Sequence, residues 1–160
     1  MPTSFEDKLK IIPISEALEV FRIRYPESDF FKVQIEPEGP YIKYEMVGND
    51  DAFKNTLEIN AHTGDEIKDK QKPIKEKRIS KNAKIRASKA LNLDELMPLS
   101  EINDLAQKQV EDAVPFQWEL DRAGERTVWK IEYASELGTE IREIKIDAHD
   151  GTIIQMKLKN

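Results

Sequence analysis

The chain has 160 residues, 39% of them hydrophobic and 35% charged, with a net charge of −6 at neutral pH. This composition is typical of a folded protein and argues against disorder. The sequence contains no cysteine, which excludes disulfides and thiolate chemistry, and no run of about 18 apolar residues that could span a membrane. The first ten residues lack the apolar core of a signal peptide. We therefore expect a cytoplasmic protein, with an exported or envelope-associated protein as the alternative if a signal segment precedes this sequence.

The first predicted element is a helix that opens within the sequence "PISEALEV". Ser15 is a favourable N-cap, and Leu18, Phe21 and Tyr25 then recur at helical spacing. Pro26 ends the pattern, because the residue before a proline disfavours helical geometry. A single amphipathic helix is therefore predicted near the amino end.

Three strands and a tight turn are predicted next. "VQIE" at 33–36 is a short strand, and "YIKYEM" at 41–46 alternates apolar and polar residues over a longer one. "LEINAHTGDEI" at 57–67 has the pattern of a hairpin that turns at "AHTGD", where Gly64 supplies the positive φ that the turn needs. A helix followed by an antiparallel sheet is the expected unit.

Residues 68–97 differ from the rest because they carry ten Lys and Arg against four Asp and Glu. After an extended start at Pro73, apolar residues at helical spacing predict an amphipathic helix from about residue 79, packed through Ile79, Ala83, Ala87, Ala90 and Leu91. Its cations should lie wholly or partly in water and form a basic patch: Lys77, Arg78, Lys81, Lys84, Arg86 and Lys89. A solvated helix face and an anion-binding patch both fit this pattern.

The second half repeats the first. "PLSE" at 98–101 follows "PISE" at 13–16 by 85 residues, and "IDAHDGTII" follows "INAHTGDEI" by 87. A gapless offset of 87 also places "YIKYEM" on "VWKIEY" at 128–133. Trp118 and Trp129 fall on predicted strands, and we expect both in the core.

The expected fold class is therefore α+β, with two repeated two-layer units of a helix and an antiparallel sheet at 11–67 and 98–160, joined by the basic helical connector at 68–97. Each unit is small enough to be marginal alone. We expect the two units to share part of a core or to pair their sheets.

The helix opening, the alternating strand and the closing hairpin in both halves resemble the PepSY domain, here in tandem. In that family the last strand pair commonly has an aspartate where the first half has Asn60. PepSY domains occur in pro-regions of thermolysin-like metallopeptidases and in bacterial envelope proteins. The resemblance implies a non-catalytic module that binds or restrains a peptidase or another protein.

Two binding modes are open. The hairpin tips, or an edge strand of the sheet, would contact a protein partner, specifically a peptidase that the module inhibits or modulates. The tip residues are His62, Thr63, Gly64, His149, Asp150 and Gly151. Alternatively, the chain is a scaffold or sensor that docks its basic helix on an acidic partner or an anionic membrane surface.

No catalytic site is predicted. The sequence has no HExxH, Walker, GxGxxG or GxSxG motif. Asp147, His149 and Asp150, or Asn60, His62 and Asp65, could contribute ligands to a divalent metal ion, but neither stretch supplies a complete ligand set. The basic segment has no aromatic residue for base stacking, which argues against nucleic acid. We therefore expect no enzyme, no cofactor and no metal.

Overall fold

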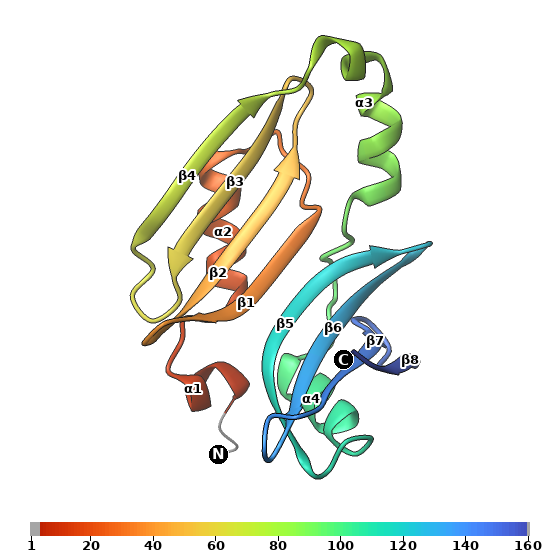
Figure 1. Cartoon of the computed structure of the whole chain (residues 1–160). Helices are drawn as coiled ribbons and strands as arrows, with labels where there is room; N and C mark the ends of the chain where they lie inside the picture. Colours follow the sequence, from red (N-terminus) through yellow and green to blue (C-terminus); the bar gives the residue numbers. More distant parts are fainter. Residues whose placement is uncertain (1–3, 160) are drawn as a thin grey trace.

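The computed structural model describes residues 4–159, which form four helices and one eight-stranded antiparallel sheet (Figure 1). The first half contains α1 (Phe5–Leu9), α2 (Ile14–Arg24), β1 (Lys32–Glu38), β2 (Tyr41–Asn49), β3 (Phe53–Asn60) and β4 (Glu66–Pro73). The second half contains α3 (Glu76–Lys89), α4 (Leu99–Gln107), β5 (Ala113–Ala123), β6 (Arg126–Ser135), β7 (Ile141–Asp147) and β8 (Ile153–Leu158). The predicted α+β class is confirmed.

The sheet is continuous across the two halves, in the order β4-β3-β2-β1-β5-β6-β7-β8. Its centre is the antiparallel pairing of β1 with β5, in which Gln34 lies opposite Glu119, 85 residues later. On either side, Val33 pairs with Leu120 and Ile35 with Trp118. This register relates the halves by an approximate two-fold axis at the Gln34–Glu119 pair. The halves therefore pair their sheets edge to edge.

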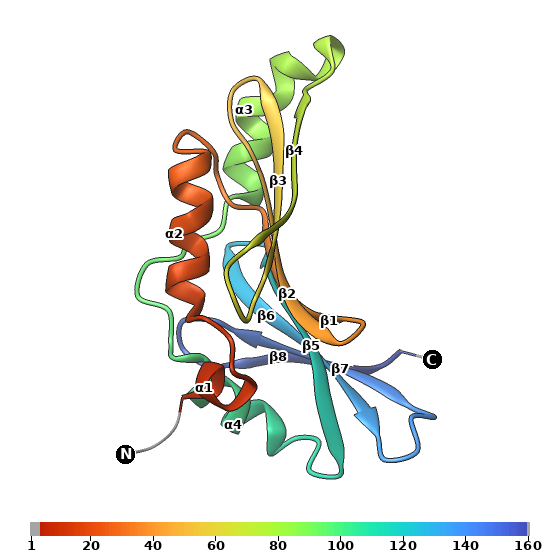
Figure 2. The same ribbon diagram turned by 90° about the vertical axis from the view of Figure 1, so that its left-hand side faces the viewer.

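A single apolar core lies on one face of the sheet. α2 and α4 both cover this face (Figure 2), and their inward side chains Phe21 and Ile102 are fully buried. The strands contribute Tyr44, Trp129 and Ile131, also buried, and the apolar cluster continues across both halves. Trp118, which is buried too, contacts Phe5 of α1 with ring centroids 4.9 Å apart. The sharing of one core explains how two marginal units become stable together.

Backbone hydrogen bonds show that the sequence offset between equivalent residues of the two halves is not constant. Ala61 N–H donates to Ile42 O at 2.8 Å, and Ala148 N–H donates to Thr127 O at 2.9 Å. The two alanines are 87 residues apart, but their acceptors are only 85 apart. The turn between β2 and β3 has three residues and that between β6 and β7 has five, which accounts for the difference. The gapless alignment of "YIKYEM" on "VWKIEY" was therefore wrong by two residues.

The basic segment is organised differently from the prediction. Residues 68–73 belong to β4, and α3 begins at Glu76 rather than at about residue 79. Within α3 the predicted apolar stripe does not pack, since Ile79 is 43% exposed and Ala83 and Ala87 are exposed as well. Ala90 and Leu91, beyond the end of the helix, are half-buried, and Leu91 packs against the core. The residue of α3 that is buried is Asn82. The stripe failed because small alanine side chains bury little apolar area, and polar contacts hold the helix instead.

Gly48 of β2 is required by a close approach between backbones. A Cβ atom there would lie 1.5 Å from the carbonyl oxygen of Asp29. The chain before β1 runs along this part of β2, with Asp29 N–H donating to Asn49 O at 2.9 Å and Phe31 N–H to Val47 O at 2.7 Å. Gly48 thereby fixes the position of Asp29, which matters for the attachment of α3.

Substitution of Gly48 by alanine should destabilise the protein by about 3 kcal/mol, because the added methyl group cannot fit without moving the backbone. The control Gly39→Ala, in a turn with open space around the residue, should cost only about 1 kcal/mol of left-handed strain. Urea unfolding followed by circular dichroism measures both. Equal losses for the two variants would contradict the close approach.

Candidate functional site

Helix α3 is attached to the first half by two polar side chains. The buried Asn82 donates through Nδ2 to Asp50 O at 2.8 Å and accepts from Asn49 Nδ2 at 3.0 Å. Arg86 donates through Nε to Asp29 Oδ2 at 2.8 Å and through Nη2 to Glu27 O at 3.1 Å. These contacts place the helix against the loops at one end of β1, β2 and β3.

The charged groups around the attachment of α3 have pKa values that favour their charged forms. The hydrogen bond from Arg86 to Asp29 raises the pKa of Arg86. Burial alone would raise the pKa of Asp50, but hydrogen bonds from Ala52 N–H, Asn55 Nδ2 and Phe53 N–H hold the pKa of this carboxyl below its usual value. The β2–β3 turn therefore presents a fixed carbonyl to Asn82.

A second arginine fastens the far end of α3 to β5. Arg122 donates through Nη1 to the carbonyl oxygens of Ala90 at 2.8 Å and Ala87 at 3.3 Å. These are acceptors at the carboxyl end of the helix, where a cation is favourable. α3 is thus held by both halves of the molecule.

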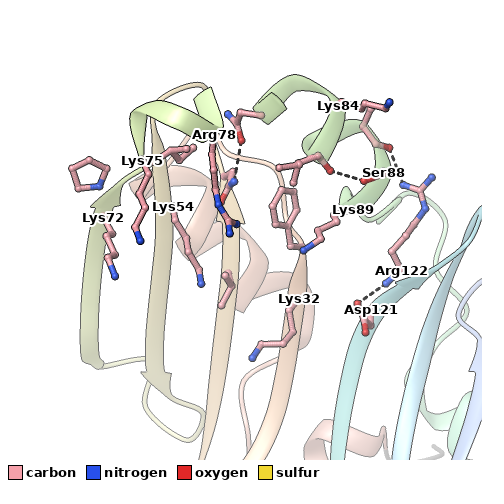
Figure 3. Close-up of a pocket in the computed structure, with 18 of the residues that line it drawn as sticks. Lys32, Lys54, Lys72, Lys75, Arg78, Lys84, Ser88, Lys89, Asp121 and Arg122 are labelled. Atoms are coloured by element: carbon pink, nitrogen blue, oxygen red, sulfur yellow. Dashed lines mark hydrogen bonds between the residues drawn. The ribbon is translucent and has the colours of Figure 1, made fainter. Parts of the chain in front are cut away.

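A groove of about 1180 Å³ lies between α3 and the sheet (Figure 3). Lys32 and Val47, which pair with each other, alternate with the buried Val33 and Met46 and therefore lie on the sheet face that α2 and α4 leave open. Apolar lining comes from Phe31, Val47 and Ile85, each half-buried. The groove is lined by cations from three elements and the linker between them: Lys54 of β3, Lys72 of β4, Lys75 of the linker, and Arg78, Lys84 and Lys89 of α3.

Within residues 4–159, none of these six cations has a carboxylate partner within 4.0 Å. Lysines elsewhere on the same face are paired: Lys43 Nζ lies 2.9 Å from Glu58, which raises the pKa of the lysine, and Lys130 Nζ lies 2.7 Å from Asp121. In the groove, by contrast, Lys54 lies directly opposite Lys72 in the β3–β4 ladder. Like charges in such a pair destabilise a sheet. The groove thus concentrates positive charge at a cost to folding.

The predicted basic patch is divided between different surfaces. Arg86 is bound to Asp29 and Asp51 and does not form part of an open surface. Lys77 and Lys81 do not line the groove but a smaller neighbouring hollow on α3, which shares Arg78 and Ile85 with the groove. Arg78, Lys84 and Lys89 line the groove, and the sequence analysis missed the partners Lys54 and Lys72, which come from strands earlier in the chain.

The hairpin tips predicted to bind a partner are tied to their own halves. Asn60 Oδ1 accepts the N–H of His62 at 2.8 Å, and Asp147 Oδ1 accepts that of His149 at 2.7 Å. Asparagine can make this turn contact as aspartate does, because the contact uses one oxygen acceptor. Asp147 also pairs through its second oxygen with Arg126 Nη1 at 3.1 Å. Thr63 is exposed, Gly64 is half-buried, and both remain predicted contacts, since nothing in the fold tests them.

The two histidines have different surroundings. His62 Nε2 accepts from Ile42 N–H at 3.1 Å, so Nδ1 carries the proton that it donates to Lys10 O at 2.8 Å. The Nε2 of His149 is buried without a partner, while its Nδ1 lies 3.9 Å from Asp147. The part of the chain that the structure describes contains no cluster of three acidic or histidine side chains that could hold a metal ion. His62 serves to fasten the start of β2 to the segment before α2.

The two edges of the sheet differ sharply. At β8, Ile154, Met156 and Leu158 are 39%, 53% and 59% exposed. Lys159 N–H donates to Ile141 O at 2.7 Å, and alternate residues of a strand direct their N–H groups to opposite sides. The backbone N–H groups of Met156 and Leu158 therefore point outward from the sheet.

The opposite edge, β4, is protected against pairing. It carries Lys68, Lys70 and Lys72 along one face and ends at Pro73. On the other face, Asp69 accepts hydrogen bonds from Arg24 and Tyr25 of the α2 region. Lysines, proline and an inward charge are the usual means of preventing unwanted strand pairing. β8 is therefore the edge that remains open.

Comparison with known protein families finds a match for the second half of the chain. Residues 97–157 match the family model of PepSY, the peptidase propeptide and YPEB domain. The matched segment begins two residues before α4 and ends within β8, and it lies in the second of the two halves that resemble this family in sequence. No curated protein matches the sequence.

The fold as a whole is similar to a crystal structure described as that of a "putative lipoprotein" from Clostridium difficile 630. The TM-score is 0.84 with 22% sequence identity, over 92% of this chain and 93% of the other. At this identity the similarity supports the fold of both halves together. Within the described residues, every helix is too short or too polar to span a bilayer.

Replacement of Arg86 by methionine should destabilise the protein by about 1–3 kcal/mol, because it removes charged hydrogen bonds and leaves Asp29 unpaired. Arg78→Met on the same helix removes an unpaired cation and should change the free energy of unfolding by less than about 0.5 kcal/mol. Chemical unfolding, with hydrogen exchange of the α3 amides, distinguishes the two. Identical behaviour would show that Arg86 does not anchor the helix.

Replacement of Lys72 by glutamine should raise the free energy of unfolding by about 0.2–1 kcal/mol, because it removes the repulsion from Lys54. Lys70→Gln is the control, since Lys70 lies opposite Thr56 on the same strands. It should have almost no effect. A destabilisation by Lys72→Gln would mean that the two lysines do not repel each other in the folded state.

Proposed function

We propose that the chain is a non-catalytic, peptidase-propeptide-like binding module that contacts its protein partner through β8. The observation that carries the proposal is the open apolar edge at Ile154, Met156 and Leu158, which begins within the matched PepSY domain. An extended segment of a partner can add to such an edge as a further strand. Inhibition or modulation of a peptidase is the specific outcome that the family description supports.

β8 offers the two kinds of contact that strand addition needs, main-chain hydrogen bonds and side-chain contacts. The outward N–H groups of Met156 and Leu158 provide main-chain hydrogen bonds, and their exposed side chains provide apolar contacts. Met156 pairs with the buried Ile144 of β7, so Met156 and Leu158 lie on the helix face of the sheet. A partner strand would therefore bury apolar surface on this face.

We further propose that residues 11–67, with β4 extending to Pro73, are a second, divergent PepSY-like unit. Equivalent hydrogen bonds support this relationship: Ile12 N–H donates to Ala61 O at 2.8 Å, as Met97 N–H does to Ala148 O at 2.9 Å. α2 and α4 begin 85 residues apart, each immediately after a proline. The hairpin tips with His62 and with His149 and Asp150 would then be equivalent secondary contacts.

We propose an exported or envelope-associated setting rather than the cytoplasm. The description of the similar structure as a lipoprotein supports it. A peptidase partner would be encountered in the same compartment. Docking of the basic helix α3 on an acidic partner would use a different surface from β8 and is independent of the proposed peptidase contact.

The proposed function can be tested with a secreted or envelope metallopeptidase recovered from the source organism. We expect the intact chain to bind it and to change its rate of casein hydrolysis at both low and high salt, since strand addition is weakly screened. Met156→Lys should weaken binding by about tenfold, because a charge on the edge opposes strand pairing.

The matched control is Ile67→Lys, which places the same charge on a residue of β4 that is 43% exposed. It should leave binding unchanged. Equal weakening by the two variants, or no effect of the chain on any metallopeptidase, would refute the proposal.

A further inference from the structure

We propose that the groove between α3 and the open face of the sheet binds an acidic peptide segment that also carries apolar side chains. This site is distinct from the β8 edge and does not depend on a peptidase partner. The inference rests on three features of the groove: its unpaired charge, its size and its mixed lining.

The charge of the groove is opposite to that of the chain. Its lining contains eight cations and two carboxylates, whereas the whole chain has a net charge of −6. Both carboxylates already have partners, Asp121 in Lys130 and Glu125 in Arg122. The six cations without a carboxylate partner therefore create a local positive potential that attracts an anion. Their repulsion is relieved when such a ligand binds.

The arrangement of these cations is a product of the tertiary structure. Lys54 and Lys72 come from β3 and β4, whereas Arg78, Lys84 and Lys89 come from a helix that Asn82 and Arg86 hold in place (Figure 3). Asn82 lines the groove and binds the β2–β3 turn, and Arg86 binds Asp29 in the loop before β1. Positive side chains are thus held on both sides of one hollow.

The size of the groove favours a polymer over a small molecule. Its volume of about 1180 Å³ exceeds the range of about 300–1,000 Å³ typical of small-ligand pockets. It is also open, and cations on opposite walls can contact successive carboxylates of one chain. A single phosphate or carboxylate ion could engage only a small part of this surface.

The mixed lining favours a peptide over a phosphate polymer or a membrane. Half-buried Phe31, Val47 and Ile85 lie among the cations, and only a ligand with apolar side chains gains from covering them. A polyphosphate offers no apolar contact. A bilayer surface is broad and cannot follow a recess between a helix and a sheet.

The test measures binding of a fluorescently labelled synthetic peptide, in which glutamate alternates with leucine, to the full chain by fluorescence anisotropy. We expect saturable binding that weakens as salt is raised, because exposed ion pairs are screened. A peptide with glutamine in place of glutamate should not bind. Polyphosphate and phosphatidylglycerol vesicles, used as competitors, should displace the acidic peptide poorly.

Two double variants of equal charge locate the site. Lys72→Gln with Lys84→Gln removes two groove cations and should weaken binding by about tenfold. Lys70→Gln with Lys81→Gln removes two cations from the same strand and the same helix outside the groove, and should change the affinity by less than about twofold. Lys54→Gln with Lys89→Gln provides a second groove variant if the first does not fold, as judged by circular dichroism.

Equal weakening by the groove and control variants would overturn the proposal, because it would show a general charge effect. Absence of peptide binding, or stronger binding of polyphosphate or vesicles with the same dependence on the groove lysines, would overturn it as well. Since none of these variants alters β8, the peptidase assay with Met156→Lys fails or succeeds independently.

Discussion

The pairing of β1 with β5 is the interaction on which the rest of the structure depends. Three residue pairs around Gln34 and Glu119 join two sheets that would otherwise each have one further open edge. Because Val33, Ile35, Trp118 and Leu120 at this join are buried, the pairing also makes one core out of two. The groove depends on it too, since its lining comes from strands on both sides of the join.

Sequence periodicity predicted most helices and strands, but it did not predict the tertiary contacts that hold α3. The two helices that contain "ISE" and "LSE" follow from apolar spacing, and the α+β class from the alternating strands beside them. The cap prediction was wrong, because Ser15 lies inside α2, whose N-cap position is Pro13. α3 could not be placed in this way, because Asn82 and Arg86 look like solvated residues in the sequence. The groove was missed for a similar reason: Lys54 and Lys72 meet α3 only through the strand register, for which the sequence has no local signal.

The two candidate surfaces occupy different parts of one rigid sheet. β8 lies at its outer edge in the second half, whereas the groove lies beside α3, where the first half meets β5. Each surface uses a different physical attraction, main-chain pairing with apolar burial at β8 and charge at the groove. If both proposals hold, the module would hold an acidic segment at one site while a partner strand occupies the other.

The difference between the two sheet edges also determines how many partners the molecule can pair with. A sheet with two open edges related by an approximate two-fold axis could add further copies at both ends, and growth would have no limit. Here Lys68, Lys70, Pro73 and the inward Asp69 close one end. Under the proposed strand addition at β8, pairing would therefore stop after one event, and the sheet would not grow into a fibre.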